Sequence, residues 1–342
     1  GIRLSDMLSQ IMSYKSIVMG QGDDKDSTRR REAGGLNKRF RALILVVMLA
    51  VMFISMYTNI SSAYSLGTAR MKSVAEEHVF HLSEWIDTQK SILDMFVSEI
   101  SANPGMLDDY EETVAWLSKI TGQYPEISVT YMTNPQLEHT VYMSNGWEPD
   151  EDWHVEERQW YIDTLSAKED WSISAPYYDE QTGGYCVTIS KMVYDSESGE
   201  FLGIFGIDFF MEKLIDILGG SYTENGYAFL VDPEGEIINH PYGAYQMTQD
   251  SATNVQNLAY GETKKNGRTT HLFRDYDGVI KISVAVRNAD SNFTVYVVSN
   301  TWKIYGNVVL YGIVCIAAFL FCIWLVYRLL TDFIRWQEKT NS

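Results

Sequence analysis

The chain has 342 residues, of which 46% are hydrophobic and 13% aromatic, and this apolar content is sufficient for the packed cores of two modest domains. Its formal net charge is −18 and its pI is near 4.7, whereas a protein that binds nucleic acid needs a basic surface. The composition therefore excludes a mainly disordered chain and argues against nucleic acid as a partner.

Two uncharged apolar runs are each long enough to cross a membrane. The first is assigned to residues 42–61 and is followed by further uncharged sequence up to Arg70, and the second comprises residues 304–327. A cleaved signal peptide is the alternative for the first run and a buried core helix for the second, although the length of each run favours a span. The sequence therefore predicts a two-pass membrane protein.

Basic residues flank the two runs on the same side. Residues 1–41 carry nine Lys or Arg against five Asp or Glu, and residues 303–342 carry four against two, whereas the residues between them carry 14 against 38. Because basic flanks stay in the cytoplasm, we predict that both termini are cytoplasmic and that residues 62–302 form an extracytoplasmic domain at the cell membrane. Within the cytoplasmic tail, residues 21–35 are predicted to be a flexible linker, and residues 328–342 begin a second linker.

A long helix is predicted to follow the first span. One stripe of this helix recurs in steps of three and four and consists of Val79, Leu82, Ile86, Gln89, Leu93, Phe96 and Ile100. The sequence Asn103-Pro104-Gly105 ends the pattern. Such a stripe packs against its own domain or forms a dimer seam, and both interpretations stay open, with a homodimer as the expected assembly.

The remaining extracytoplasmic residues mix helical and strand patterns. In residues 106–215 we expect helices at 109–120 and 157–164 and strands at 127–132, 139–143, 185–194 and 201–209. In residues 221–300 we expect a hairpin over 227–241 and strands at 281–286 and 293–298. Strands joined by tight turns favour antiparallel sheets, so the predicted fold class is α+β, with a long N-terminal helix and two sheet modules between two transmembrane helices.

Cysteine and histidine provide no further chemistry. Cys315 and Cys322 fall within the second span, so Cys186 is the sole extracytoplasmic cysteine of the sequence and no disulfide framework is possible. The six histidines lack the spacing of metal ligands, and the acidic loops lack the ordered pattern of a calcium loop. We therefore expect neither a metal site nor a cofactor.

Opposite charges and aromatic side chains gather between residues 156 and 208. Arg158 presents a planar donor fork suited to an α-carboxylate, and Trp160 adds an indole N–H. Asp179 and Asp208 are suited to an α-ammonium group, with a contribution from the hydroxyl of Tyr177. A zwitterion needs a partner of this kind at each end.

The order of these segments resembles a double Cache sensor domain over residues 62–302. The resemblance rests on R-x-W-Y, on the strand pair ending in G-I-D, and on GYAFLVDPEGEIINHP at 226–241. It implies two PAS-like modules, and in the subclass that binds free amino acids it implies a ligand site formed by Arg158, Trp160, Tyr161, Tyr177, Asp179 and Asp208. Trp153 stands where that subclass usually has Tyr, which removes one hydroxyl from the implied site.

The candidate residues also have structural interpretations. Arg158 is able to pair with Glu156, Glu157 or a carboxylate on a strand, and Asp208 is able to cap a helix that begins near Phe209. Tyr177 is able to serve as a core or rim aromatic residue. These alternatives stay open at the level of sequence.

No catalytic motif is present: the sequence contains no P-loop, no G-x-S-x-G, and no kinase or cyclase signature. We expect the chain to be the ligand-binding sensory input region of a bacterial transmembrane receptor, with a free amino acid as its small-molecule ligand and a histidine kinase of a two-component system as the preferred output. The alternatives are the input region of a diguanylate cyclase or chemoreceptor that senses another small molecule, and a surface structural or peptide-binding protein.

The predicted topology is testable with reporters. A fluorescent protein fused after Ser342 should be fluorescent and alkaline phosphatase at the same place inactive, because both basic flanks stay inside. The same reporters fused after Trp302, upstream of the second span, should give the opposite result. Active phosphatase at Ser342 would contradict the two-span topology.

Overall fold

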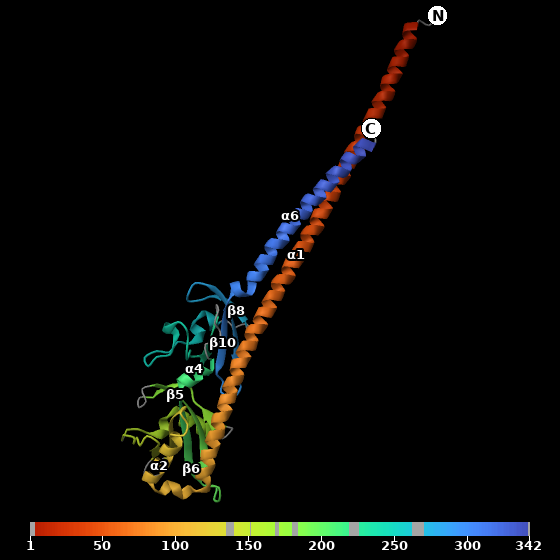
Figure 1. Cartoon of the computed structure of the whole chain (residues 1–342). Coiled ribbons are helices and arrows are strands. Elements are labelled where there is room, and N and C mark those ends of the chain that lie inside the picture. Colours follow the sequence, from red (N-terminus) through yellow and green to blue (C-terminus); the bar gives the residue numbers. More distant parts are fainter. Residues whose placement is uncertain are drawn as a thin grey trace. The chain divides into compact units, whose positions relative to one another are not determined.

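The computed structural model describes residues 4–134, 140–150, 152–167, 171–179, 184–218, 226–261 and 270–340. The chain divides into two compact units, and we refer to residues 1–64 with 305–342 as the helical unit and to residues 65–304 as the sheet unit. Within the sheet unit, Figure 1 shows two sheets lying along the part of helix α1 that ends at Ala102.

The helical unit consists of parts of α1 (Leu4–Ala102) and α6 (Thr301–Thr340). The described residues include two helical segments long and apolar enough to cross a membrane, one in each helix, Arg41–Ala102 and Thr301–Leu329. In the most apolar 18-residue stretch of each segment, 0% of the residues are buried in the first segment and 6% in the second. A core helix, in contrast, is mostly buried. This exposure argues against a core helix as the interpretation of the second run.

The prediction of a flexible linker at residues 21–35 is wrong, because α1 is helical throughout this segment. Its glycines stand near the two ends of the segment, and residues 23–33 consist largely of charged residues, Ser, Thr and Ala, among which Lys, Arg, Glu and Ala are good helix formers. The helix-forming residues between the glycines therefore determine the structure of this segment more than the glycines do.

The first sheet of the sheet unit is antiparallel throughout, in the order β2-β1-β6-β5-β3 with β4 also paired to β5. Its strands are β1 (Ile127–Thr133), β2 (Val141–Met143), β3 (Trp171–Ile173), β4 (Tyr177–Asp179), β5 (Gly184–Tyr194) and β6 (Phe201–Phe210). The associated helices are α2 (Tyr110–Thr121), α3 (Gln159–Ser166) and α4 (Met211–Leu218). These elements confirm the predicted helices and longer strands, whereas β3 and β4 were not predicted and residue 139 lies outside the described residues.

Alternation along β6 gives the first sheet two different faces. Phe205, Ile207 and Phe209 are fully buried in one core together with side chains of α1 and α2. Because successive side chains of a strand point to opposite sides, Ile204 and Asp208 face the other way, toward the side that α3 covers. The face carrying Asp208 is therefore separated from the main apolar core by the sheet itself.

The second sheet is also antiparallel, in the order β7-β10-β9-β8. Its strands are β7 (Gly226–Val231), β8 (Thr270–Arg274), β9 (Ile280–Arg287) and β10 (Thr294–Asn300). Phe229 and Tyr296 stack in its core with ring centroids 4.9 Å apart. Asn288 donates to the hydroxyl of Ser83 at 2.7 Å and thereby joins this sheet to α1.

The predicted hairpin over residues 227–241 is wrong in its second half. Val231 and Ile237 form a single bridge after the turn, but residues 236–241 make no strand. The side chain of Asn239 accepts from the backbone N–H of Leu230 at 2.8 Å, where a second strand would offer a backbone carbonyl. This side-chain acceptor ends the ladder after one bridge.

Leu93 gives a direct test of the core between α1 and the first sheet. Its side chain is 0% exposed, so Leu93→Ala should lower the free energy of unfolding by about 2–5 kcal/mol. Urea denaturation followed by tryptophan fluorescence measures this change. The control Met95→Ala lies on the same helix at 50% exposure and should cost less than about 0.5 kcal/mol; equal costs for the two variants would contradict the assigned core.

Candidate functional site

Asp208 is the centre of a buried polar cluster on the α3 side of the first sheet. The residue is 4% exposed, and its carboxylate accepts hydrogen bonds from three hydroxyl groups. Oδ1 accepts from Thr188 at 2.6 Å and from Tyr131 at 3.1 Å, and Oδ2 accepts from Tyr177 at 2.8 Å. Asp208 lies within β6 and α4 begins at Met211, so the helix-cap interpretation of Asp208 is wrong.

The sheet register brings these groups together. Thr188 on β5 and Val129 on β1 both pair with Asp208, and Tyr131 pairs with Gly206 two residues earlier on β6. A Cβ atom at Gly206 would lie 2.4 Å from the ring of Tyr131, so the absence of a side chain there makes room for this ring. Glycine at this position therefore allows the hydroxyl of Tyr131 to reach Asp208.

Aromatic rings form the surface beside this cluster. The rings of Tyr131 and Trp160 are 5.0 Å apart between centroids. Trp153 and Trp160 each pack against two apolar clusters, one containing Tyr131 and the other containing Tyr161 and Ile204. Tyr161 is itself 5% exposed and belongs to the second cluster, against which Trp153 and Trp160 pack.

Arg158 lies at the edge of the same aromatic surface. Its guanidinium carbon is 5.0 Å from the centroid of the Trp153 ring, a cation–π distance. Arg158 is exposed, and among the described residues no carboxylate forms an ion pair with it. The predicted alternative, a salt bridge to Glu156 or Glu157, is absent from the described part of the chain.

The electrostatic environment of Asp208 is unusual for a carboxylate. Burial raises its pKa to about 6, although the hydrogen bonds from Thr188, Tyr177 and Tyr131 act in the opposite direction. The charge of Asp179 adds to the increase, which places this second carboxylate close enough to affect Asp208. No basic side chain of the described residues forms an ion pair with Asp208.

The phenols around Asp208 remain protonated donors. Burial and then the charge of Asp208 raise the pKa values of Tyr131 and Tyr177 well above the ordinary value for tyrosine. The site therefore presents a carboxylate held by neutral hydroxyl groups, which is suited to accept a proton-bearing cation. Within the described residues, no three His, Cys, Asp or Glu side chains are grouped so as to hold a metal ion.

The structure links four of the six predicted residues directly or through one aromatic ring. Tyr161 lies in the apolar cluster with Ile204, and Asp179, on β4, affects Asp208 through its charge. Tyr177 and Asp208 are in direct contact, Trp160 reaches them through Tyr131, and Arg158 borders the shared aromatic surface through Trp153. Sequence reasoning missed Thr188, and it did not place Tyr131 in the site.

Comparison with known sequences gives one family. The Cache domain profile dCache_1 matches residues 64–308. The methyl-accepting chemotaxis protein McpA of Pseudomonas putida is 25% identical over 219 residues, which cover 60% of this chain and 32% of the relative. The chain therefore spans about a third of the length of this curated relative.

Solved structures of similar fold are ligand-binding domains of chemoreceptors. The domain of Pseudomonas fluorescens CtaA in complex with L-serine has a TM-score of 0.55 at 18% identity and covers 68% of this chain and 96% of its own. The domain of Pseudomonas aeruginosa PctC in complex with GABA has a TM-score of 0.54 at 19% identity, with 68% and 99% covered. At this identity the likeness concerns the fold.

The raised pKa of Asp208 predicts a pH-dependent effect of its replacement. In the unfolded chain this carboxyl has a pKa of about 4, so the folded state binds the proton more tightly and loses stability as the pH rises from about 4 to 6. Asp208→Asn removes this loss. Relative to the wild type, the variant should gain about 2 kcal/mol between pH 4.5 and 7.5 in the absence of ligand, measured by urea denaturation. A difference that does not change with pH would contradict a buried, unneutralised carboxylate.

Proposed function

Because the chain belongs to the Cache domain family, we propose that it is the sensory input region of a transmembrane receptor and that its first sheet binds a free α-amino acid. The observation that carries this proposal is the arrangement of two opposite charges without ion-pair partners among the described residues. Asp208 and Arg158 border one aromatic surface, so a zwitterion is the class of ligand that neutralises both.

The hydrogen bonds of Asp208 favour a ligand with an ammonium group. A carboxylate offers about four lone-pair positions, and Thr188, Tyr131 and Tyr177 occupy three of them, two on Oδ1 and one on Oδ2. One position on Oδ2 is left for an N–H donor. The ammonium group would also neutralise a buried charge, and Asp179 would contribute further negative potential.

The other end of the ligand is assigned to Arg158 and Trp160. The guanidinium offers two parallel N–H donors for a carboxylate, and stacking on Trp153 limits its orientations. In this assignment Trp153 compensates for its missing hydroxyl by supporting Arg158. Tyr161 contributes packing beneath Trp160 and makes no direct contact with the ligand.

Similar proteins support an amino-acid ligand and a chemoreceptor output. The solved neighbours include the CtaA domain with L-serine and the PctC domain with GABA, and the curated relative is a methyl-accepting chemotaxis protein. We therefore propose a chemoreceptor signalling domain in place of the histidine kinase that the sequence favoured. In this arrangement the first sheet is distal and the second proximal to the membrane, α1 and α6 carry the signal, and the homodimer remains a prediction.

The ligand assignment predicts a strict requirement for both charged ends. The full chain in lipid nanodiscs should be stabilised against heat by one or more proteinogenic amino acids and by neither the matching carboxylic acid nor the matching amine. The acid leaves the buried carboxylate of Asp208 unpaired, and the amine lacks the contact with the guanidinium of Arg158. Alanine, propionate and ethylammonium form one such set. Equal stabilisation by propionate or ethylammonium would exclude the zwitterion assignment.

Variants at the two ends should lose affinity for the stabilising amino acid. Each charge-assisted hydrogen bond contributes about 1.5–3 kcal/mol, so Arg158→Ala and Asp208→Asn should each raise the Kd by about tenfold to a hundredfold in calorimetric titrations. The exposed neighbours Glu157 and Glu212 provide the controls Glu157→Ala and Glu212→Ala, which should leave the Kd unchanged. Wild-type affinity in Arg158→Ala or Asp208→Asn would refute the assigned contacts.

A further inference from the structure

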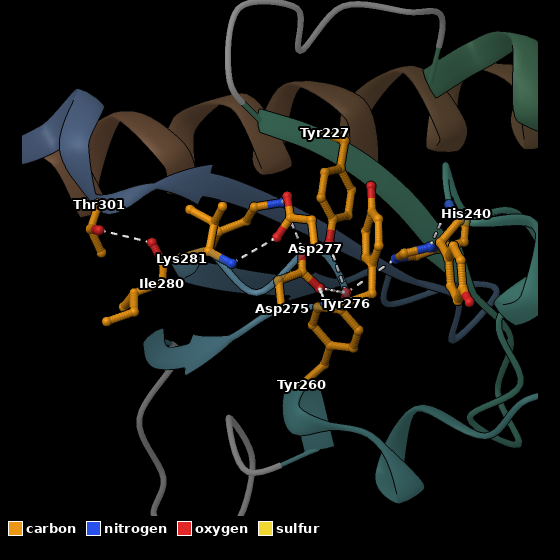
Figure 2. Close-up of polar contacts among 11 residues, drawn as sticks. Tyr227, His240, Tyr260, Asp275, Tyr276, Asp277, Ile280, Lys281 and Thr301 are labelled. Carbon is orange, nitrogen blue, oxygen red and sulfur yellow. Dashed lines mark hydrogen bonds and ion pairs between the residues drawn. The ribbon is translucent and has the colours of Figure 1, made fainter.

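A second carboxylate held by tyrosine hydroxyl groups lies in the second sheet. Asp275 follows β8, and its side chain is 2% exposed. Oδ2 accepts from Tyr227 at 2.6 Å, and Oδ1 accepts from Tyr260 at 2.6 Å and from the backbone N–H of Tyr276 at 2.8 Å. Figure 2 shows these side chains converging on Asp275.

Lys281 completes this cluster with an ammonium group. Its Nζ lies 2.8 Å from Asp275 Oδ2 and 2.7 Å from Asp277 Oδ2. The same nitrogen lies 5.1 Å from the ring centroids of both Tyr227 and Tyr276. With its side chain only 6% exposed, Lys281 is enclosed by two carboxylates and two aromatic rings, the groups that proteins use to bind an ammonium ion.

The strand register explains why this lysine is buried. Lys281 on β9 pairs with Phe273 on β8, and paired residues of neighbouring strands point to the same face of a sheet. Phe273 belongs to the apolar core of the second sheet. The side chain of Lys281 thus extends over the core face, and its ammonium group reaches the carboxylates at the edge of that face.

The two sheets use the same donors but differ in charge balance. Each has a carboxylate that accepts from two tyrosine hydroxyls, Asp208 in the first sheet and Asp275 in the second. Burial favours protonation of both, yet the hydrogen bonds from Lys281, Tyr227 and Tyr260 outweigh burial and lower the pKa of Asp275 below its ordinary value. The pKa of Asp208, which has no ion pair among the described residues, is raised.

We propose that Lys281 is a tethered ammonium group that occupies an ammonium-binding site in the second sheet, and that this site accepts a free primary alkylammonium ion when the lysine side chain is removed. The wild-type site is closed to free cations because its own chain fills it. This proposal does not depend on which ligand the first sheet binds.

The position of the site connects it to α6. Lys281 pairs with Asn300, the last residue of β10. The neighbouring carbonyl of Ile280 accepts from the hydroxyl of Thr301, the first residue of α6, at 2.8 Å, as Figure 2 shows. The site of Lys281 therefore lies beside the point where the sheet ends and α6 begins.

Chemical rescue tests the proposal. Lys281→Ala removes three methylene groups and the amine, which together correspond to propylammonium. In the full chain in nanodiscs, the variant should have a lower Tm than the wild type, and propylammonium chloride at about ten times its Kd should raise the Tm by about 2–4 °C. 1-Propanol, which lacks the charge, should have no effect, and the wild type and Lys281→Ala/Asp275→Asn should not respond to propylammonium.

Two results would overturn the proposal. One is a folded Lys281→Ala variant, judged by circular dichroism, whose Tm does not respond to propylammonium. The other applies to the wild type and remains informative if the variant does not fold. In reductive methylation followed by mass spectrometry, Lys281 should react at least about tenfold more slowly than the exposed Lys119, since its amine is enclosed. Equal rates would show that the ammonium group is not held in the site.

Discussion

A buried negative charge that the described residues leave without a cation governs the chemistry of the first sheet. Leaving an ionised carboxylate unpaired in a protein interior is costly, and hydroxyl donors compensate only in part. Asp208 has three such donors, but its pKa is still raised, so the hydrogen bonds do not fully replace solvent. In the proposed site this unbalanced charge would favour a cationic group, because a neutral ligand of the same shape would leave the cost in place.

The second sheet shows the alternative solution to the same physical problem. There the chain supplies its own cation, Lys281, and the buried carboxylate of Asp275 is paired within the fold. The two sheets therefore hold similar tyrosine–carboxylate arrangements, one without a cationic partner among the described residues and one with a cation supplied by its own chain. Lys281, on the central strand β9, has no counterpart at Asp208 among the described residues.

Much of this organisation could be predicted from the sequence, because the apolar stripe of α1, the long strands and the charged motif residues have strong local signals. Thr188 could not be predicted, since its role depends on register. Counting back from the pair Tyr194 and Phe201 would place Val187 opposite Asp208, but a bulge at Leu202 shifts the pairing by one residue. A shift of one residue exchanges the two faces of a strand, so the sequence alone does not identify which side chain meets Asp208. The failed hairpin at residues 236–241 has a similar cause, because the side chain of Asn239 replaces a backbone acceptor.

The junction of β10 and α6 has a further consequence for how a signal could leave the sheet unit. Asn300 ends the strand and Thr301 begins the helix with no residue between them. The pairing of β10 consequently sets the direction in which each side chain of the first turn of α6 points. One inserted residue at this junction would rotate these directions by about 100° about the helix axis. An insertion at this junction would therefore change which side of the first turn of α6 continues from the strand, whereas an insertion in the exposed turn after β5 would leave this relation unchanged.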